Sequence, residues 1–160
     1  MVNEQLTARL SRILLQNQTG MVKEQDVRNL CSSNEEYSQI IPQLVSDFKN
    51  LGLSLIRTKF QGDRYFVVTT PGKDSRITPS MYGTMALLIA TANEIGNDLD
   101  VAKMKKIFKN VWSDVESLIT LEYLSLQETK GGEKIEITPI GKGAFKNIMK
   151  DLNLKTVSNL

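Results

Sequence analysis

The fold is decided by a change of hydrophobic period within residues 41–70, which read IPQLVSDFKNLGLSLIRTKFQGDRYFVVTT. In the first part apolar residues recur every three or four positions, which predicts an amphipathic helix at about 41–51. Gly52 then supplies the left-handed residue that commonly ends a helix. Beyond it the period falls to two, and the glycine of Gln61-Gly62-Asp63-Arg64 predicts the turn of a β-hairpin.

Two further amphipathic helices are predicted before this segment, at about 3–17 and 22–31. Asn34 is expected to cap a short turn at 35–39, and Pro42 to occupy the first position of the third helix. Three helices followed by a two-stranded hairpin is the element order of a winged helix, that is, a helix-turn-helix with a β-hairpin wing. The first half of the chain is therefore expected to form one such unit.

The second half of the chain repeats this order. Ser80 is expected to cap a helix that runs to about Glu94, and Asp98 or Asp100 to cap the short helix that follows. The other predicted elements are a helix at about 111–122, strands at 124–127 and 134–138 around Gly131-Gly132, and a last helix at about 142–152 behind Pro139-Ile140-Gly141.

A short sequence match accompanies this repeated order of elements. Leu53-Ser54-Leu55 follows the third helix of the first half and Leu124-Ser125-Leu126 that of the second, so the expected period is 71 residues. We therefore expect an α+β, mostly helical chain of two tandem winged-helix units. The expected organisation is a first winged-helix domain at 1–71, a linker at 72–79, a second winged-helix domain with a C-terminal helix at 80–152, and a flexible tail at 153–160.

The composition argues against catalysis. The 160 residues include no histidine and a single cysteine, which removes the usual general acid–base group and excludes an intramolecular disulfide. The sequence contains no nucleotide-binding loop and no helical pair of metal ligands. We therefore expect a protein that is not an enzyme and uses no cofactor or metal. Cys31 is expected to be a small packed side chain.

The sequence also predicts a cytoplasmic location. The first ten residues carry Glu4 and Arg9 among polar side chains and lack the apolar core of a signal peptide. The most apolar segment, 81–92, is shorter than the roughly 20 residues of a membrane span. Its many apolar and small side chains leave two interpretations, packing within the second unit, which we favour, or burial against another unit or a partner.

Charge limits how well such a protein can read DNA. Lys and Arg total 20 and Asp and Glu total 18, a net charge of only +2, which is too small for a strongly basic DNA-binding protein. The predicted third helix of the second half offers Asp114, Glu116 and Glu122 and no basic side chain, so we do not expect it to read sequence.

Basic side chains gather elsewhere, around the first hairpin and on the second helix of the second half. As phosphate contacts they would give weak, salt-sensitive binding without sequence preference. A solvated helix face is an equally good interpretation of the lysines. The candidate DNA-phosphate contacts are Arg57, Lys59, Arg64, Lys103, Lys105, Lys106 and Lys109.

The whole chain resembles the kleisin-interacting tandem winged-helix proteins, which include segregation and condensation protein B and the MAGE-homology subunit of an SMC complex. Ile41-Pro42-Gln43-Leu44 and the segment onward to Leu53 look like the third helix of a MAGE-type first unit. Arg64-Tyr65-Phe66-Val67-Val68 looks like its returning wing strand. The passage from Ile77-Thr78-Pro79 to Asp100-Val101 is similar to the opening of the second unit in both relatives.

The resemblance implies a function without catalysis. It implies an accessory subunit that binds the kleisin of an SMC complex, often as a dimer, and assists chromosome condensation and segregation at the nucleoid. Such a protein would bind duplex DNA weakly if at all. The alternative is a winged-helix DNA-binding transcription regulator, which would bind a defined sequence.

Overall fold

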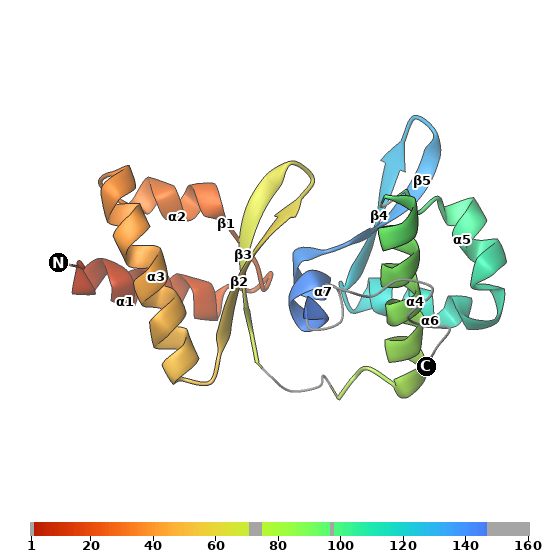
Figure 1. Ribbon diagram of the computed structural model, residues 1–160, viewed down its shortest axis with the longest axis horizontal. Helices are drawn as coiled ribbons and strands as arrows, with labels where there is room; N and C mark the ends of the chain where they lie inside the picture. Colours follow the sequence, from red (N-terminus) through yellow and green to blue (C-terminus); the bar gives the residue numbers. More distant parts are fainter. Residues whose placement is uncertain (1, 71–74, 97, 147–160) are drawn as a thin grey trace. The chain divides into compact units, whose positions relative to one another are not determined.

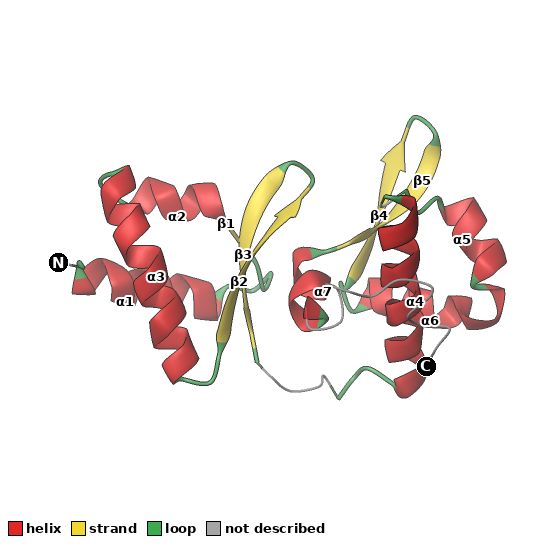
Figure 2. Cartoon of the chain, in the orientation of Figure 1, coloured by secondary structure: helices red, strands yellow, loops and turns green. Residues whose placement is uncertain are grey.

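The computed structural model describes residues 2–70, 75–96 and 98–146. The chain divides into two compact units, Met1–Gly72 and Lys73–Leu160. Each unit combines helices with a small antiparallel sheet (Figures 1 and 2), so the expected α+β, mostly helical class is confirmed. Among the described residues, no helix has both the length and the apolar character needed to cross a membrane.

The first unit is a set of helices packed on a three-stranded sheet with strand order β1-β3-β2. Leu10, Ile40 and Leu44 are completely buried between helices and sheet, with Phe48 and Phe66 beside them. The half-buried Cys31 packs against the same core, as expected from the sequence. The elements of this unit are α1 (Glu4–Gln16), β1 (Val22–Lys23), α2 (Glu24–Leu30), α3 (Asn34–Asn50), β2 (Ser54–Phe60) and β3 (Asp63–Thr69).

The third helix is longer than the sequence predicts, because α3 runs without interruption from Asn34 through Pro42. The predicted cap at Asn34 is wrong by one residue. The hydroxyl of Ser33 accepts from the amide of Glu36 at 3.1 Å, and the carboxylate of Glu36 accepts from the amide of Ser32 at 2.6 Å. Pro42 lies on the exposed side of the helix, where solvent can hydrate the carbonyl that the proline leaves without a donor.

The second helix is shorter than predicted, because Val22 and Lys23 form the strand β1 instead of its first turn. β1 pairs antiparallel with β3, with Val22 opposite Phe66. Val22 is buried at 6% exposure, so the strand pairing places it in the core. A pairing of two residues leaves no alternating pattern in the sequence, which is why periodicity alone assigns the segment to a helix.

The second unit is built around the long helix α4, which is buried on several sides. Met85, Leu88 and Ile89 are completely buried, and the half-buried Leu87 also packs on the core of this unit. The elements are α4 (Pro79–Ile95), α5 (Val101–Ile107), the 3-10 turn η1 (Lys109–Val111), α6 (Trp112–Thr120), β4 (Leu124–Thr129), β5 (Gly132–Ile137) and α7 (Pro139–Ala144).

Two predicted helix starts in the second unit are corrected by threonine caps. The hydroxyl of Thr78 accepts from the amide of Met81 at 3.1 Å, so the cap of α4 is Thr78 rather than Ser80, and Pro79, the last residue of the expected linker, is the first residue of α4. The hydroxyl of Thr138 accepts from the amide of Gly141 at 3.0 Å, so α7 begins at Pro139 rather than at 142. Proline suits the first position of a helix because the missing amide has no partner there.

The predicted cap at Asp100 is confirmed, since its carboxylate accepts from the amide of Lys103 at 2.9 Å. Just before α5, Asp100 forms an antiparallel bridge with Lys134 of β5, and the carbonyl of Leu99 accepts from the amide of Ile135. In the first unit β1 makes the corresponding pairing to the last strand just before α2. The flexible tail and the end of the last predicted helix lie outside the described residues.

Helices α3 and α6 end in the same hydrogen-bonded motif. Gly52 donates to the carbonyl of Lys49, and the next residue, Leu53, donates to that of Phe48. Glu122 and Tyr123 make the same two bonds at the end of α6, as in a Schellman motif. Gly52 and Glu122 therefore correspond, and the two Leu-Ser-Leu sequences are offset by one residue from this correspondence.

Candidate interaction surfaces

The helices that precede the two hairpins, α3 and α6, are both acidic. α3 carries Glu35, Glu36 and Asp47 against a single lysine, and α6 carries Asp114 and Glu116 with no basic residue. In a helix-turn-helix that reads DNA, this helix lies in the major groove between two phosphate backbones. Carboxylates there repel the phosphates. Sequence reading by either helix is electrostatically disfavoured.

The sequence suggests that Asp114 is a free surface carboxylate, but in the structure this side chain is hydrogen-bonded. Its Oδ2 accepts from the hydroxyl of Ser80 at 2.5 Å and from that of Thr84 at 3.2 Å. Thr84 is buried and Asp114 is half-buried. The carboxylate therefore ties the N-terminal part of α6 to α4, and α6 presents less negative charge to solvent than the sequence implies.

Arg57, one of the predicted phosphate contacts, is bound to a buried carboxylate. Its Nε and Nη2 donate to the two oxygens of Glu24 at 2.8 Å and 2.7 Å. Glu24 is only 4% exposed, and this two-pronged geometry is the strongest that arginine makes with a carboxylate. A phosphate would have to compete with that carboxylate, so Arg57 is a poor phosphate contact and instead holds β2 to α2.

Glu24 collects further donors from two helices. Tyr37 of α3 donates its hydroxyl to Oε1 at 2.7 Å, and Arg28 of α2 donates to the same oxygen at 3.0 Å. The Arg28 guanidinium also stacks 3.9 Å above the Tyr37 ring. Burial opposes ionisation of Glu24, but the hydrogen bonds from Arg57, Tyr37 and Arg28 outweigh it and lower the pKa of the carboxyl to about 2. Burial and the same carboxylate raise the pKa of Tyr37 to about 12.

The other predicted contacts in the first unit lie on the wing formed by β2 and β3. Lys59 and Arg64 are opposite each other in the strand register, and both are exposed. Acidic side chains share this end of the hairpin, since Asp63 pairs with Lys23 at 3.1 Å. A shallow hollow of about 280 Å³ beside the turn is lined by both signs of charge: Lys23, Glu24, Gln25, Arg28, Gly62, Asp63 and Arg64.

The predicted contacts in the second unit form one exposed lysine cluster. Lys103, Lys105 and Lys106 lie on α5 and Lys109 on the following 3-10 turn. Lys105 places its ammonium 5.5 Å from the centre of the Trp112 ring, within the range of a cation–π contact. The Ile107 side chain is 65% exposed among them. The positive charge of this cluster suits an anionic partner.

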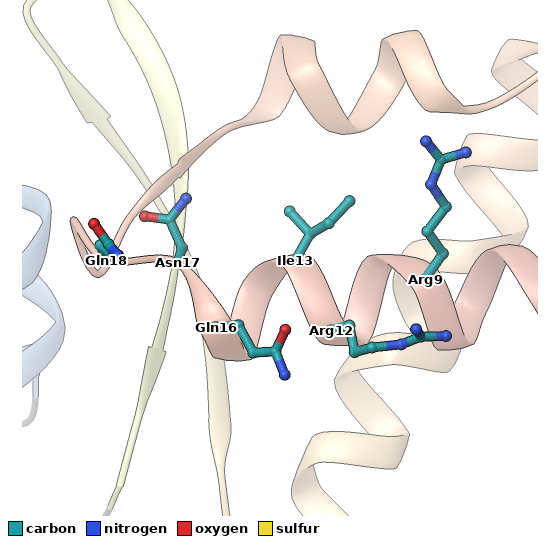
Figure 3. Close-up of a pocket in the computed structure, with 6 residues that line it drawn as sticks. All are labelled: Arg9, Arg12, Ile13, Gln16, Asn17 and Gln18. Carbon is teal, nitrogen blue, oxygen red and sulfur yellow. The ribbon is translucent and has the colours of Figure 1, made fainter.

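A basic hollow on α1 was missed in the sequence. It is an open depression of about 560 Å³, and Figure 3 shows its side chains on α1 and on the segment just after this helix. The signal was present in the spacing, because Arg9 and Arg12 lie three residues apart and away from the buried Leu6, Leu10 and Leu14. The lining residues are Arg9, Arg12, Ile13, Gln16, Asn17 and Gln18.

Of the seven predicted contacts, Arg57, Lys59 and Arg64 belong to the first unit, and the lysine cluster belongs to the second. Within the described ranges, no group of three or more histidine, cysteine, aspartate or glutamate side chains is placed to hold a metal ion. No protein-family model matches the chain, and no curated protein matches it either, so these surfaces are assigned from their own chemistry.

Proposed function

We propose that the chain is a tandem winged-helix protein that acts without catalysis as an accessory subunit of an SMC–kleisin-type complex. It binds a kleisin-like partner, as a monomer or a dimer, and assists chromosome condensation and segregation at the nucleoid. The observation that carries the proposal is the acidic character of α3 and α6. A winged helix whose recognition helices repel phosphate is better suited to bind protein than to read DNA.

The arrangement of elements supports the winged-helix part of the proposal. In each unit a short backbone pairing precedes the second helix, the third helix ends in a Schellman motif, and a hairpin follows. The sequence resemblance to kleisin-binding proteins supports the partner. The order of elements and the sequence resemblance both concern the scaffold, and neither argument depends on an individual catalytic or ligand-binding side chain.

Weak DNA binding accompanies this function through the lysine cluster of α5 and η1. Because the contacts are made by exposed ammonium groups, affinity falls steeply with salt and does not depend on sequence. Arg64 and Lys59 of the wing contribute less, since Asp63 lies beside them. The lysine cluster is also the observation that favours the second candidate function, a DNA-binding transcription regulator.

Co-purification with the kleisin subunit encoded in the same genome tests the proposal. The tagged full chain should retain the kleisin through gel filtration, and the triple change Lys103→Glu, Lys106→Glu and Lys109→Glu should abolish DNA retention while leaving kleisin capture intact. A folded chain that retains no kleisin contradicts the proposed function.

Selection from random duplexes separates the two candidate functions. The proposed scaffold enriches no motif, and its retention of duplex DNA is lost as salt rises. Enrichment of one defined motif that survives moderate salt would instead establish the transcription regulator.

A further inference from the structure

The arginines of the α1 hollow, Arg9 and Arg12, are without a partner among the residues that the structure describes. Neither Arg9 nor Arg12 makes a hydrogen bond or an ion pair with any residue in the described ranges, and both side chains are exposed. Figure 3 shows both arginine side chains on the surface of α1. The situation differs from that of Arg57 and Arg28, which both form ion pairs with Glu24.

The hollow is also free of negative charge. None of its six lining residues, all of them described, is acidic, and the one carboxylate of α1 is Glu4 in the first turn. Three of the lining residues are the amides Gln16, Asn17 and Gln18, which can donate hydrogen bonds to an anion. The surface is therefore built from donors and fits an anionic ligand.

A neighbouring apolar side chain indicates what kind of anion the hollow fits. Ile13 lines the hollow with the two arginines and is only half-buried. A phosphodiester backbone gains nothing from this side chain, whereas an amphipathic helix buries an apolar residue of its own on it. Arg9 and Arg12 lie one helical turn apart, which matches two carboxylates one turn apart on a facing helix.

We propose that the α1 face formed by Arg9, Arg12, Ile13 and Gln16 docks an acidic amphipathic helix of a protein partner. This inference rests on the proposed function, since it names the face used and the charge of the segment that the partner offers. The two arginines hold the carboxylates in forked hydrogen bonds, and Ile13 contacts the apolar side of the docked helix.

Fluorescence anisotropy on the full chain tests the docking directly. The probe is a labelled helical peptide with glutamates one turn apart and leucines beside them, compared with a peptide in which every glutamate is glutamine. The wild-type chain should bind the glutamate peptide about tenfold or more tightly than the glutamine peptide. The double change Arg9→Glu and Arg12→Glu should remove that preference. Equal affinity for both peptides overturns the inference.

Matched single changes control for net charge. Lys49 of α3 is exposed like Arg12, so Lys49→Glu alters the charge of the unit as much as Arg12→Glu. Only Arg12→Glu should weaken peptide binding, and circular dichroism should show both variants folded. Equal losses in the two variants overturn the proposed site, as does Arg12-dependent binding of a duplex DNA probe in place of the peptide.

Kleisin capture separates this inference from the function on which it rests. If the wild-type chain captures the kleisin and the Arg9→Glu, Arg12→Glu variant captures it equally well, the docking face is wrong and the proposed function stands. If the wild-type chain captures no kleisin but binds the glutamate peptide through Arg9 and Arg12, the proposed function is wrong and the acidic-helix site stands.

Discussion

Gly52 and Glu122 occupy the same left-handed backbone position, one after α3 and the other after α6, with φ angles of 78° and 65°. Both donate to the carbonyl three residues earlier, and their successors close the motif in the same way. Glycine adopts this conformation without steric cost, whereas a residue with a Cβ is strained by roughly 1–2 kcal/mol. The second unit carries a strain that the first avoids.

Replacing Glu122 by glycine should therefore stabilise the second unit by about 1 kcal/mol. The chain has a single tryptophan, Trp112 in α6, so its fluorescence during urea unfolding follows this unit. The reverse change, Gly52→Ala, should destabilise the first unit by a similar amount. An added Cβ at Gly52 meets no atom within 4 Å, so the effect comes from the backbone alone. A Glu122→Gly variant no more stable than the parent contradicts the assignment.

The buried carboxylate of Glu24 should make the first unit sensitive to acid. Its pKa is lowered from 4.5 to about 2, so its contribution is complete above pH 4.5 and is lost as the pH falls through the folded value. The stabilisation that this carboxylate gives the first unit at neutral pH is about 3 kcal/mol. Glu24→Gln should remove this pH dependence and destabilise the unit at neutral pH, as followed by the NMR signals of Phe48 and Phe66 in urea. Glu35→Gln, at an exposed position of α3, is the control and should change stability far less.

Gly141 should tolerate no side chain. A Cβ built there overlaps the backbone carbonyl of Tyr123 and crowds the side chain of Ile137. Because a backbone carbonyl cannot rotate away as a side chain can, Gly141→Ala should destabilise the second unit by roughly 1–3 kcal/mol or more. The same Trp112 transition measures it, and an unchanged midpoint would show that α7 packs differently against the turn after α6.

Gly83 should behave in the opposite way. It lies within α4, it is exposed, and an added Cβ meets nothing within 4 Å. Gly83→Ala should therefore stabilise the second unit by roughly 0.5–1 kcal/mol, because alanine loses less backbone entropy in a helix. Destabilisation by this small change would indicate that another part of the protein covers Gly83 closely.

The elements that periodicity predicted well are those with a long apolar stripe or a glycine-bearing turn. The stripe of Leu6, Leu10 and Leu14 gave α1 to within one residue, and Gln61-Gly62 does form the first hairpin turn, with φ angles of 50° and 84°. Pro42 was read as a helix start because a sequence does not show that its carbonyl partner faces solvent. β1 was missed because two residues carry no period.

The charged surfaces were harder to predict, because pairing is set by contacts distant in sequence. Arg57 donates to Glu24, which is 33 residues distant in sequence, and Asp114 accepts from Ser80, which is 34 residues distant. A count of charged residues in the sequence treats these paired groups as free charges. The lysines of α5 were placed correctly on an exposed face, since adjacent residues on one short helix need no distant contact to define them. The Arg9–Arg12 pair is equally local, since the two residues lie one turn apart on α1 and away from its apolar stripe.

The Glu24 carboxylate joins α2, α3 and β2 through three donors, and this arrangement has an evolutionary consequence. A change at Glu24 alone leaves two guanidinium groups and a phenol without their shared acceptor, whereas exchanging Glu24 and Arg57 together for apolar residues also removes one of those guanidinium groups and leaves only Arg28 and Tyr37 to find other partners. Among relatives of this chain, Glu24 and Arg57 should therefore covary, while Arg9 and Arg12 should change only when the partner's acidic segment changes with them.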